Sequence, residues 1–210
     1  MIIHQIYWDF EKKNTPMPKL YTKFQKKVKL FATKNKYSYK LWNESMVDKL
    51  VNKYPKYKYM IDNVRYTIMK VDIVKFLILY DMGGLYLDLD IEPIIKKLKD
   101  YDFAIASSGK DKYNVDVIQS KKKNPLNLLY LDYIKTQISE KSKMNIYKIW
   151  KFRYVLHTTG PRSLVRWIKQ TKLKINTYKV NDATTNPPSM NLNGGEEFID
   201  YPSTLWKGKT

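Results

Sequence analysis

A long apolar segment, a pair of glycines and a short alternating segment follow one another between residues 64 and 91. Residues 64–81 are apolar over enough turns to predict a buried helix. Gly83 and Gly84 are expected to end that helix, because glycine adopts the left-handed backbone conformation that closes a helix. Residues 85–91 alternate apolar and polar side chains, which predicts a strand. A strand that follows a buried helix so closely indicates a sheet covered by helices.

Strands and helices alternate along the rest of the chain as well. Strands are predicted at residues 2–7, 37–42, 102–106 and 115–119, and helices at 19–34, 45–53, 125–138 and 162–170. Ser45 is expected to cap its helix, and Pro55 to interrupt the chain before the next element. The tail beyond Asn181 is rich in loop residues, and no repeat or low-complexity linker divides the sequence. We therefore predict an α/β sandwich with a mainly parallel central sheet.

The alternating segment ends in two carboxylates. In a strand, alternate side chains share a face, so one face would carry Leu85, Leu87 and Leu89, and the other Tyr86, Asp88 and Asp90. Two carboxylates on one face raise each other's pKa unless a cation lies between them. Mg²⁺ and Mn²⁺ prefer carboxylate oxygens and keep positions open for phosphate. Asp88 and Asp90 are therefore predicted metal ligands; the alternative is that both simply end a strand at the solvent.

A charged pair interrupts the apolar helix. Asp72 lies in an otherwise apolar part of it, where a charge is costly unless it is paired or used. Lys75 follows three residues later, on the same face of the helix. An Asp–Lys pair within the helix explains this pattern without any function. The functional interpretation is that this face looks into a cleft, where Asp72 binds sugar hydroxyls.

The segment from Lys70 to Asp90, with Gly-Gly-Leu-Tyr-Leu-Asp-Leu-Asp as its core, resembles the DXD sugar transferases of glycosyltransferase family 32. That family includes yeast mannosyltransferases and capsule or lipopolysaccharide sugar transferases. Residues 2–7 resemble its first strand, and Asn124-Pro125 and residues 159–161 fall in the family's order. The resemblance implies a GT-A fold, a Rossmann-like α/β/α sandwich, over residues 1–210, either alone or as one domain of a longer protein. Residues 1–120 would bind nucleotide-sugar and metal, and residues 121–210 would form the acceptor side.

The resemblance also implies roles for individual residues. Asp90 would bind Mn²⁺ or Mg²⁺ directly, and Asp88 would contact both the metal and the donor ribose. The implied donor-binding residues are Gln5, Ile6, Tyr7, Asp72, Lys75, Gly83, Gly84, Tyr86 and Asp88. The implied catalytic residues are Asp72, Lys75 and Asp116. Asp116 would lie under the reacting sugar, or else it is a carboxylate at a strand end on the surface.

The sequence departs from the family's pattern in three places. Lys75 stands where the family usually has Arg, which replaces a bidentate contact by a point charge. Tyr7 stands in place of Trp, and the adjacent Trp8 is either its substitute or a core residue. The family's C-terminal His and Ser-Trp segment has no clear counterpart, so a third protein ligand of the metal stays unassigned. The nearest material is Asp200, Tyr201, Pro202, Ser203 and Trp206.

The formal net charge of +19 exceeds what one diphosphate site requires. It is explained by biased amino-acid usage, or by attraction to a nucleotide donor, an anionic membrane surface or an anionic polymer. A nucleic-acid-binding module is the alternative function, although no recognised nucleic-acid motif is present. With no cysteine, no signal peptide and no long apolar span, we expect a cytoplasmic protein that is soluble or attached peripherally to a membrane.

The resemblance and the carboxylates at the end of the strand together predict a metal-dependent glycosyltransferase. It would use a nucleoside-diphosphate sugar, with UDP favoured over GDP, and a glycan or glycoprotein acceptor, and it would retain the anomeric configuration. An aspartyl phosphatase is disfavoured, because Ile91 follows Asp90 where that chemistry places a small polar residue. His4 is expected to be a core residue whose ring nitrogens are hydrogen-bonded. For His157, a position facing the cleft and a position away from it are both open.

Overall fold

A computed structural model describes residues 1–8, 16–110, 112–142, 151–182 and 196–201. The helices are α1 (Lys19–Lys34), α2 (Glu44–Val51), α3 (Pro55–Asn63), α4 (Thr67–Met82), α5 (Pro125–Ser142), α6 (Lys151–Thr158) and α7 (Pro161–Thr171). The strands are β1 (Ile2–Ile6), β2 (Ser38–Trp42), β3 (Gly84–Leu87), β4 (Ile91–Pro93), β5 (Phe103–Ser107), β6 (Tyr113–Ser120), β7 (Asn176–Asp182) and β8 (Phe198–Asp200). They form one eight-stranded sheet in the order β2-β1-β3-β6-β5-β7-β8-β4.

Most strands of this sheet share one direction. In the part of the chain that the structure describes, β2, β1, β3, β5, β7 and β8 run one way, and β6 and β4 run the other. The predicted α/β architecture with a mainly parallel sheet is confirmed. Strands from both ends of the chain enter the same sheet, since β7 pairs with β5 and β8 pairs with β4.

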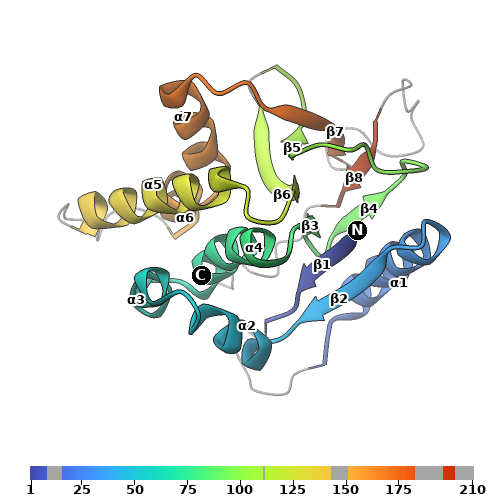
Figure 1. The fold of residues 1–210 in the computed structure, drawn as a ribbon, viewed down its shortest axis with the longest axis horizontal. Coiled ribbons are helices and arrows are strands. Elements are labelled where there is room, and N and C mark those ends of the chain that lie inside the picture. Colours follow the sequence, from blue (N-terminus) through green and yellow to red (C-terminus); the bar gives the residue numbers. More distant parts are fainter. Residues whose placement is uncertain (9–15, 111, 143–150, 183–195, 202–210) are drawn as a thin grey trace.

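The two faces of the sheet bury separate cores. Helices α2 to α7 gather on one side of the sheet and α1 lies on the other (Figure 1). Neighbouring residues of β3 alternate between the cores as predicted: Tyr86 packs under the larger helical layer, and Leu85 and Leu87 pack toward α1. Because helices cover both faces of the sheet, β3 is buried throughout and carries large apolar or aromatic side chains on both faces.

Helix α4 is the central buried helix, and glycine ends it as predicted. Gly83 has φ of 68° and donates its N–H to the Leu79 carbonyl at 2.8 Å. The helix begins at Thr67 rather than at residue 64, because Val64 is extended after the end of α3. A Cβ on Gly84 would lie 2.3 Å from the Ile2 carbonyl oxygen, so this position admits only glycine if β1 and β3 are to pair.

Several boundaries differ from the sequence prediction for local reasons. Asn43, not Ser45, caps α2: its side chain accepts the N–H of Met46 at 3.0 Å. Pro55 does not interrupt the chain but opens α3, where its missing N–H is of no consequence. The sequence analysis missed α3, α6, β7 and β8, which are short or rich in polar residues. The predicted loop-rich tail at residues 183–195 lies outside the described residues.

His4 is a satisfied core residue, as expected. It has no exposed surface, and its Nδ1 accepts the Trp42 indole N–H at 3.2 Å. An indole N–H only donates, so Nε2 carries the proton and donates to the Gly83 carbonyl at 2.9 Å. Burial lowers the pKa of His4 to about 4, from an ordinary value of 6.5.

This pKa predicts an acid-sensitive fold. A histidine that stays neutral when folded but is protonated when unfolded stabilises the protein fully above pH 6.5, and that stability is lost as pH falls toward 4. Between pH 7 and pH 4 the loss should be about 3 kcal/mol. The measurement is the free energy of unfolding in urea at pH 7 and pH 4, for wild type and for His4→Gln. Other groups titrate in both proteins, so the difference between the two pH dependences is the contribution of His4. If the free energy of unfolding changed equally with pH in both proteins, His4 would not be the cause of the loss.

Candidate active site

The two predicted metal ligands lie in a turn rather than on a strand. Strand β3 ends at Leu87, and residues 88–90 turn so that the Ile91 N–H donates to the Asp88 carbonyl at 3.3 Å. The prediction that residues 85–91 form one strand is therefore wrong beyond Leu87, and Leu89 is partly exposed rather than in the core. In a turn the two carboxylates are no longer held a fixed strand repeat apart, so both can approach one ion.

Contacts from three other segments, to main-chain atoms of the turn, fix its position. The Gln5 amide donates to the Asp88 carbonyl at 3.1 Å, and the Asp88 N–H donates to the Asp116 carbonyl at 2.9 Å. The Tyr201 N–H donates to the Asp90 carbonyl at 3.0 Å. Each contact uses main-chain atoms of the turn, so the backbone positions of Asp88 and Asp90 are set by neighbouring segments.

One oxygen of Asp88 is engaged inside the protein. Its Oδ1 accepts the Tyr86 hydroxyl at 2.7 Å and lies 3.4 Å from the Lys75 ammonium. Burial raises the pKa of Asp88 to about 6, and the charge of Asp90 adds to the rise while Lys75 opposes it. Tyr86 is itself fully buried, so its geometry supports positioning of Asp88 rather than the donor contact that the sequence analysis predicted.

Lys75 is completely occupied by the protein. Its side chain is 1% exposed, and its ammonium contacts Asp72 Oδ1 at 3.1 Å, Asp88 Oδ1 at 3.4 Å and the Val115 carbonyl at 3.1 Å. An ammonium has three N–H groups, so none is left for a ligand. Burial alone would lower the pKa of Lys75, but Asp88 and Asp72 outweigh it and the pKa is raised. These contacts favour a positioning role for Lys75, and its catalytic and donor-binding role stays a prediction.

Asp72 is both paired and connected to the second half of the chain. It is 6% exposed, faces Lys75 as the helical spacing predicts, and accepts the Thr159 hydroxyl at 2.8 Å through Oδ2. Thr159 lies between α6 and α7, 87 residues further along the chain. The simple ion pair and the site role are therefore compatible, because Asp72 shares Lys75 with Asp88.

Asp116 joins the same acidic group from β6. It is 5% exposed, and Oδ2 accepts the Asn114 amide at 2.5 Å. Among the residues that the structure describes, Oδ1 has no hydrogen-bond partner. Burial raises the pKa of Asp116 to about 8, with a further contribution from Asp88. Without a bound cation this carboxyl is therefore protonated at neutral pH, and the interpretation as a surface strand-end residue is wrong.

The acidic residues of the turn suit a divalent cation. The charge of Asp90 adds to the raised pKa of Asp88, and a cation that prefers oxygen ligands would remove this repulsion. Over the described ranges, no group of three or more His, Asp or Glu side chains is arranged to hold a metal alone. A metal at this site would need further ligands from outside the described side chains, such as diphosphate oxygens.

The first strand reaches past β3 toward this turn. Strand β1 pairs with β3 at Ile3 and His4, so Gln5 and Ile6 extend beyond that pairing. Tyr7 is partly exposed there, while Trp8 belongs to the core and is not its substitute. The Gln5 side chain is fully used, since Tyr39 donates to its Oε1 at 2.9 Å. Any contact of Gln5 or Ile6 with a nucleotide base would therefore come from the backbone.

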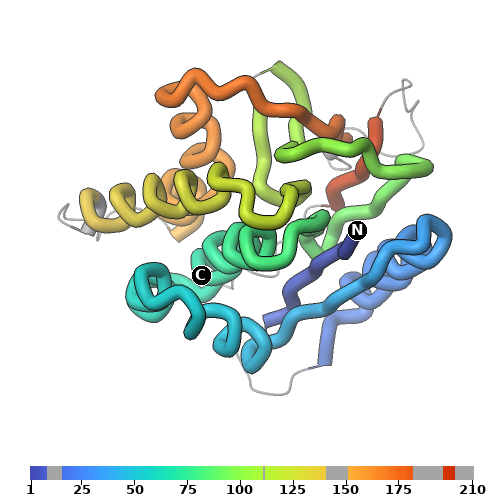
Figure 2. Tube along the Cα trace, in the orientation of Figure 1, coloured from blue at the N-terminus to red at the C-terminus, as the bar shows by residue number. Residues whose placement is uncertain are grey.

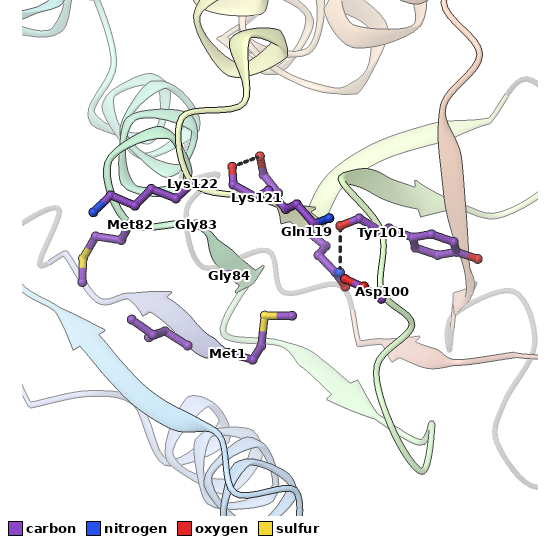
Figure 3. Close-up of a pocket in the computed structure, with 11 residues that line it drawn as sticks. Met1, Met82, Gly83, Gly84, Asp100, Tyr101, Gln119, Lys121 and Lys122 are labelled. Carbon is purple, nitrogen blue, oxygen red and sulfur yellow. Dashed lines mark hydrogen bonds between the residues drawn. The ribbon is translucent and has the colours of Figure 1, made fainter.

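The two glycines lie at the other end of β3. Gly83 precedes the strand and Gly84 is its first residue, whereas Asp88 follows its last residue. They line a separate cavity of about 210 Å³ together with Met1, Lys121 and Lys122 (Figure 3). This placement does not fit the predicted donor-binding role of the glycines. Their small size is explained by packing, because a Cβ on Gly83 would lie 2.5 Å from the Lys122 nitrogen.

The other histidine is held by arginines. His157 lies in the last turn of α6, and its two ring nitrogens lie 2.9 Å from Arg162 and 3.1 Å from Arg166. The contact of Thr159 with Asp72, and the bonds that Tyr86 and Tyr201 make to the turn, were not predicted from the sequence. A hydroxyl in the Thr-Gly-Pro turn was the one available signal for Thr159. Of the candidate C-terminal counterparts, Asp200 and Tyr201 lie beside the turn, and Pro202, Ser203 and Trp206 lie outside the described residues.

Comparison with known proteins finds similarity to sugar transferases. Residues 21–103 match the family described as "Glycosyltransferase sugar-binding region containing DXD motif". A stretch of 56 residues is 43% identical to inositol phosphoceramide mannosyltransferase 3 of Schizosaccharomyces pombe. That match covers 26% of this chain and 16% of the relative, so the chain aligns with a small part of it.

Two solved structures share the fold. The PaToxG glycosyltransferase superposes with a TM-score of 0.53 at 16% identity, covering 81% of this chain and 68% of that one. The ligand-free glycosyltransferase domain of the YGT toxin gives 0.53 at 10% identity, covering 85% and 79%. The resemblance to DXD-motif sugar transferases and the GT-A fold that it implies are thereby confirmed.

Proposed function

We propose that this chain, a DXD-motif glycosyltransferase domain of GT-A fold, moves a sugar from a nucleoside-diphosphate donor to a hydroxyl acceptor. The observation that carries the proposal is the turn with Asp88 and Asp90, fixed by three other segments and joined to Asp72 through buried Lys75. UDP-sugar is the favoured donor and GDP-sugar the second. The acceptor is a glycan or glycoprotein hydroxyl, or a lipid-linked one, as the name of the yeast relative suggests.

Asp90 and the free Oδ2 of Asp88 would hold Mn²⁺ or Mg²⁺ against the diphosphate. When bound, the ion would neutralise the charge that develops on the leaving group. The chain's own residues do the rest. Asp72, oriented by Thr159 and Lys75, accepts hydrogen bonds from sugar hydroxyls. Partly exposed Tyr7 packs on the base, beside the backbone of Gln5 and Ile6.

Asp116 would hold a proton close to the reacting sugar. The carboxyl is buried beside the turn, and burial together with the charge of Asp88 raises its pKa, which favours the protonated form. Transfer would retain the anomeric configuration: the acceptor hydroxyl attacks from the leaving-group side, and a diphosphate oxygen takes its proton. Residues 1–120 would supply donor and metal contacts and residues 121–210 the acceptor side, with Thr159 already reaching across.

A thermal-shift panel of UDP-, GDP- and CMP-linked ligands, each with and without Mn²⁺, tests this function. A ligand at about 100 times its Kd adds about 2.7 kcal/mol of stability, which raises Tm by about 5–10 °C for a chain of this size. We expect that rise for one nucleotide only, and only with metal. Stabilisation by none of the ligands, or by all of them without metal, would reject the proposal.

A further inference from the structure

The outward face of α1 is a continuous basic stripe. Helix α1 contains six lysines and no acidic residue. The spacing of Lys19, Lys23, Lys26, Leu30 and Lys34 places them on one face of the helix, and all five are exposed. We call these five residues the α1 stripe. The opposite face, with Phe24, Val28 and Phe31, is buried against the sheet.

The lysines of the α1 stripe have no acidic partner within the described part of the chain. Lys27, at the margin of the stripe, pairs with Glu92 at 2.6 Å, whereas the four stripe lysines form no ion pair there. Like charges gathered on one helix destabilise it by repulsion. An anionic surface would remove this cost, so the charge pattern is complementary to such a surface.

An exposed leucine lies in the middle of these charges. Leu30 is 55% exposed and Leu20, at the edge of the same face, is 45% exposed. An exposed apolar side chain gains nothing from a polyphosphate or an acidic protein, but it gains free energy when it enters the boundary between lipid headgroups and acyl chains. Lysines around leucines are the arrangement by which amphipathic helices lie flat on anionic membranes.

The stripe lies on the helix that packs against Tyr201, the residue that bonds to the turn at residues 88–90. The Phe24 ring stacks on Tyr201 with centroids 4.6 Å apart, and the Tyr201 N–H holds the Asp90 carbonyl. Lys27 and Tyr201 both reach Glu92, directly after the turn. A surface bound by the outward face of α1 would therefore lie on the opposite side of this helix from Tyr201 and the turn. None of the described helices has the length and apolar character of a membrane span.

We propose that α1 docks this domain flat onto an anionic lipid surface, with the four lysines on the headgroups and Leu30 inserted between them. The proposal goes beyond the transferase activity and does not depend on it. Each lysine near an anionic membrane contributes about 1 kcal/mol, or roughly a fivefold gain in partitioning, and the gain is screened by salt.

Co-sedimentation of the full chain with vesicles tests it. The vesicles are pure phosphatidylcholine or an equimolar mixture with phosphatidylserine. We expect binding to the mixture alone. Replacing all four stripe lysines by Gln should lower the partition coefficient by at least about 100-fold. The matched control replaces Lys110, Lys122, Lys135 and Lys174 by Gln, which are exposed, lie outside α1 and change the net charge equally. It should retain most of the binding.

Leu30→Ser separates a membrane from an anionic polymer. This variant should weaken vesicle binding by roughly fivefold to tenfold while leaving binding to heparin or duplex DNA unchanged. Equal loss in the stripe and control variants would overturn the proposal, because binding would then follow net charge alone. Binding to DNA with none to the mixed vesicles would overturn it in favour of a nucleic-acid partner. Far-ultraviolet circular dichroism and Tm verify that each variant is folded.

Discussion

Asp90→Asn is expected to abolish metal-dependent sugar transfer while leaving the fold intact. The substitution removes one of two carboxylates that would bind the ion, and loss of that electrostatic stabilisation should lower turnover by on the order of 10³-fold. The fold should survive, because Asn has nearly the same size as Asp and the Asp90 carbonyl keeps its bond from the Tyr201 N–H. Removing one negative charge also relieves Asp88, whose pKa should fall below about 6.

The measurements are donor hydrolysis or transfer with and without Mn²⁺, and the Tm of the metal-free protein. Wild type and Asp90→Asn should unfold within a degree or two of each other without metal, and only wild type should gain stability from Mn²⁺ with nucleotide. An unchanged turnover number would show that the ion, if any, binds elsewhere. A variant that fails to fold would be uninformative about the metal, so Asp88→Asn serves as the second test, with the same expected result.

Lys75→Met is expected to cost the most stability of any single change considered. The ammonium touches two carboxylates and a carbonyl inside the protein, and methionine has similar length but no charge. Breaking a buried ion pair from one side costs about 3–5 kcal/mol, because the remaining charges are left without a partner. Urea unfolding at pH 8 should show this as a large fall in the midpoint.

The pH dependence of that loss identifies its cause. In Lys75→Met the pKa of Asp88 should rise further above its ordinary value, since Lys75 now opposes that rise. A carboxyl with a raised folded pKa costs stability as pH increases, so the deficit relative to wild type should be larger at pH 8 than at pH 5. A deficit that is independent of pH would point to packing alone. Lys53→Met is the control: Lys53 pairs with Asp81 on the surface, and its loss should cost less than about 1 kcal/mol.

Local pattern was sufficient to predict the elements nearest the site. The apolar run that became α4, the glycines that end it, and the alternation of β3 are set by residues within one segment, so periodicity reads them directly. The Asp72–Lys75 pair was predictable for the same reason, since one helical turn brings the two side chains together.

Long-range contacts explain what the sequence could not indicate. Lys75 finds its other partners on the β3 turn and at Val115, 13 and 40 residues away. Thr159 reaches Asp72 from a turn whose position depends on how α6 and α7 pack. The strand was predicted too long because its end is decided by pairing with β6 and by the neighbouring β4, not by its own alternation. Strand β8 has three residues, too few for any periodicity.

The pairing of β4 with β8 has a consequence for synthesis. Glu92 and Tyr201 are 109 positions apart, yet they hydrogen-bond beside Asp90, and in Figure 2 the red β8 runs next to the green β4. On the ribosome, residues 88–93 emerge long before residues 198–201. The nascent chain can fold α4 and β3 early, but the loop carrying both aspartates must wait for that late partner. A growing polypeptide should therefore complete this turn only after residues 198–201 have been made, when α4 and β3 are already present.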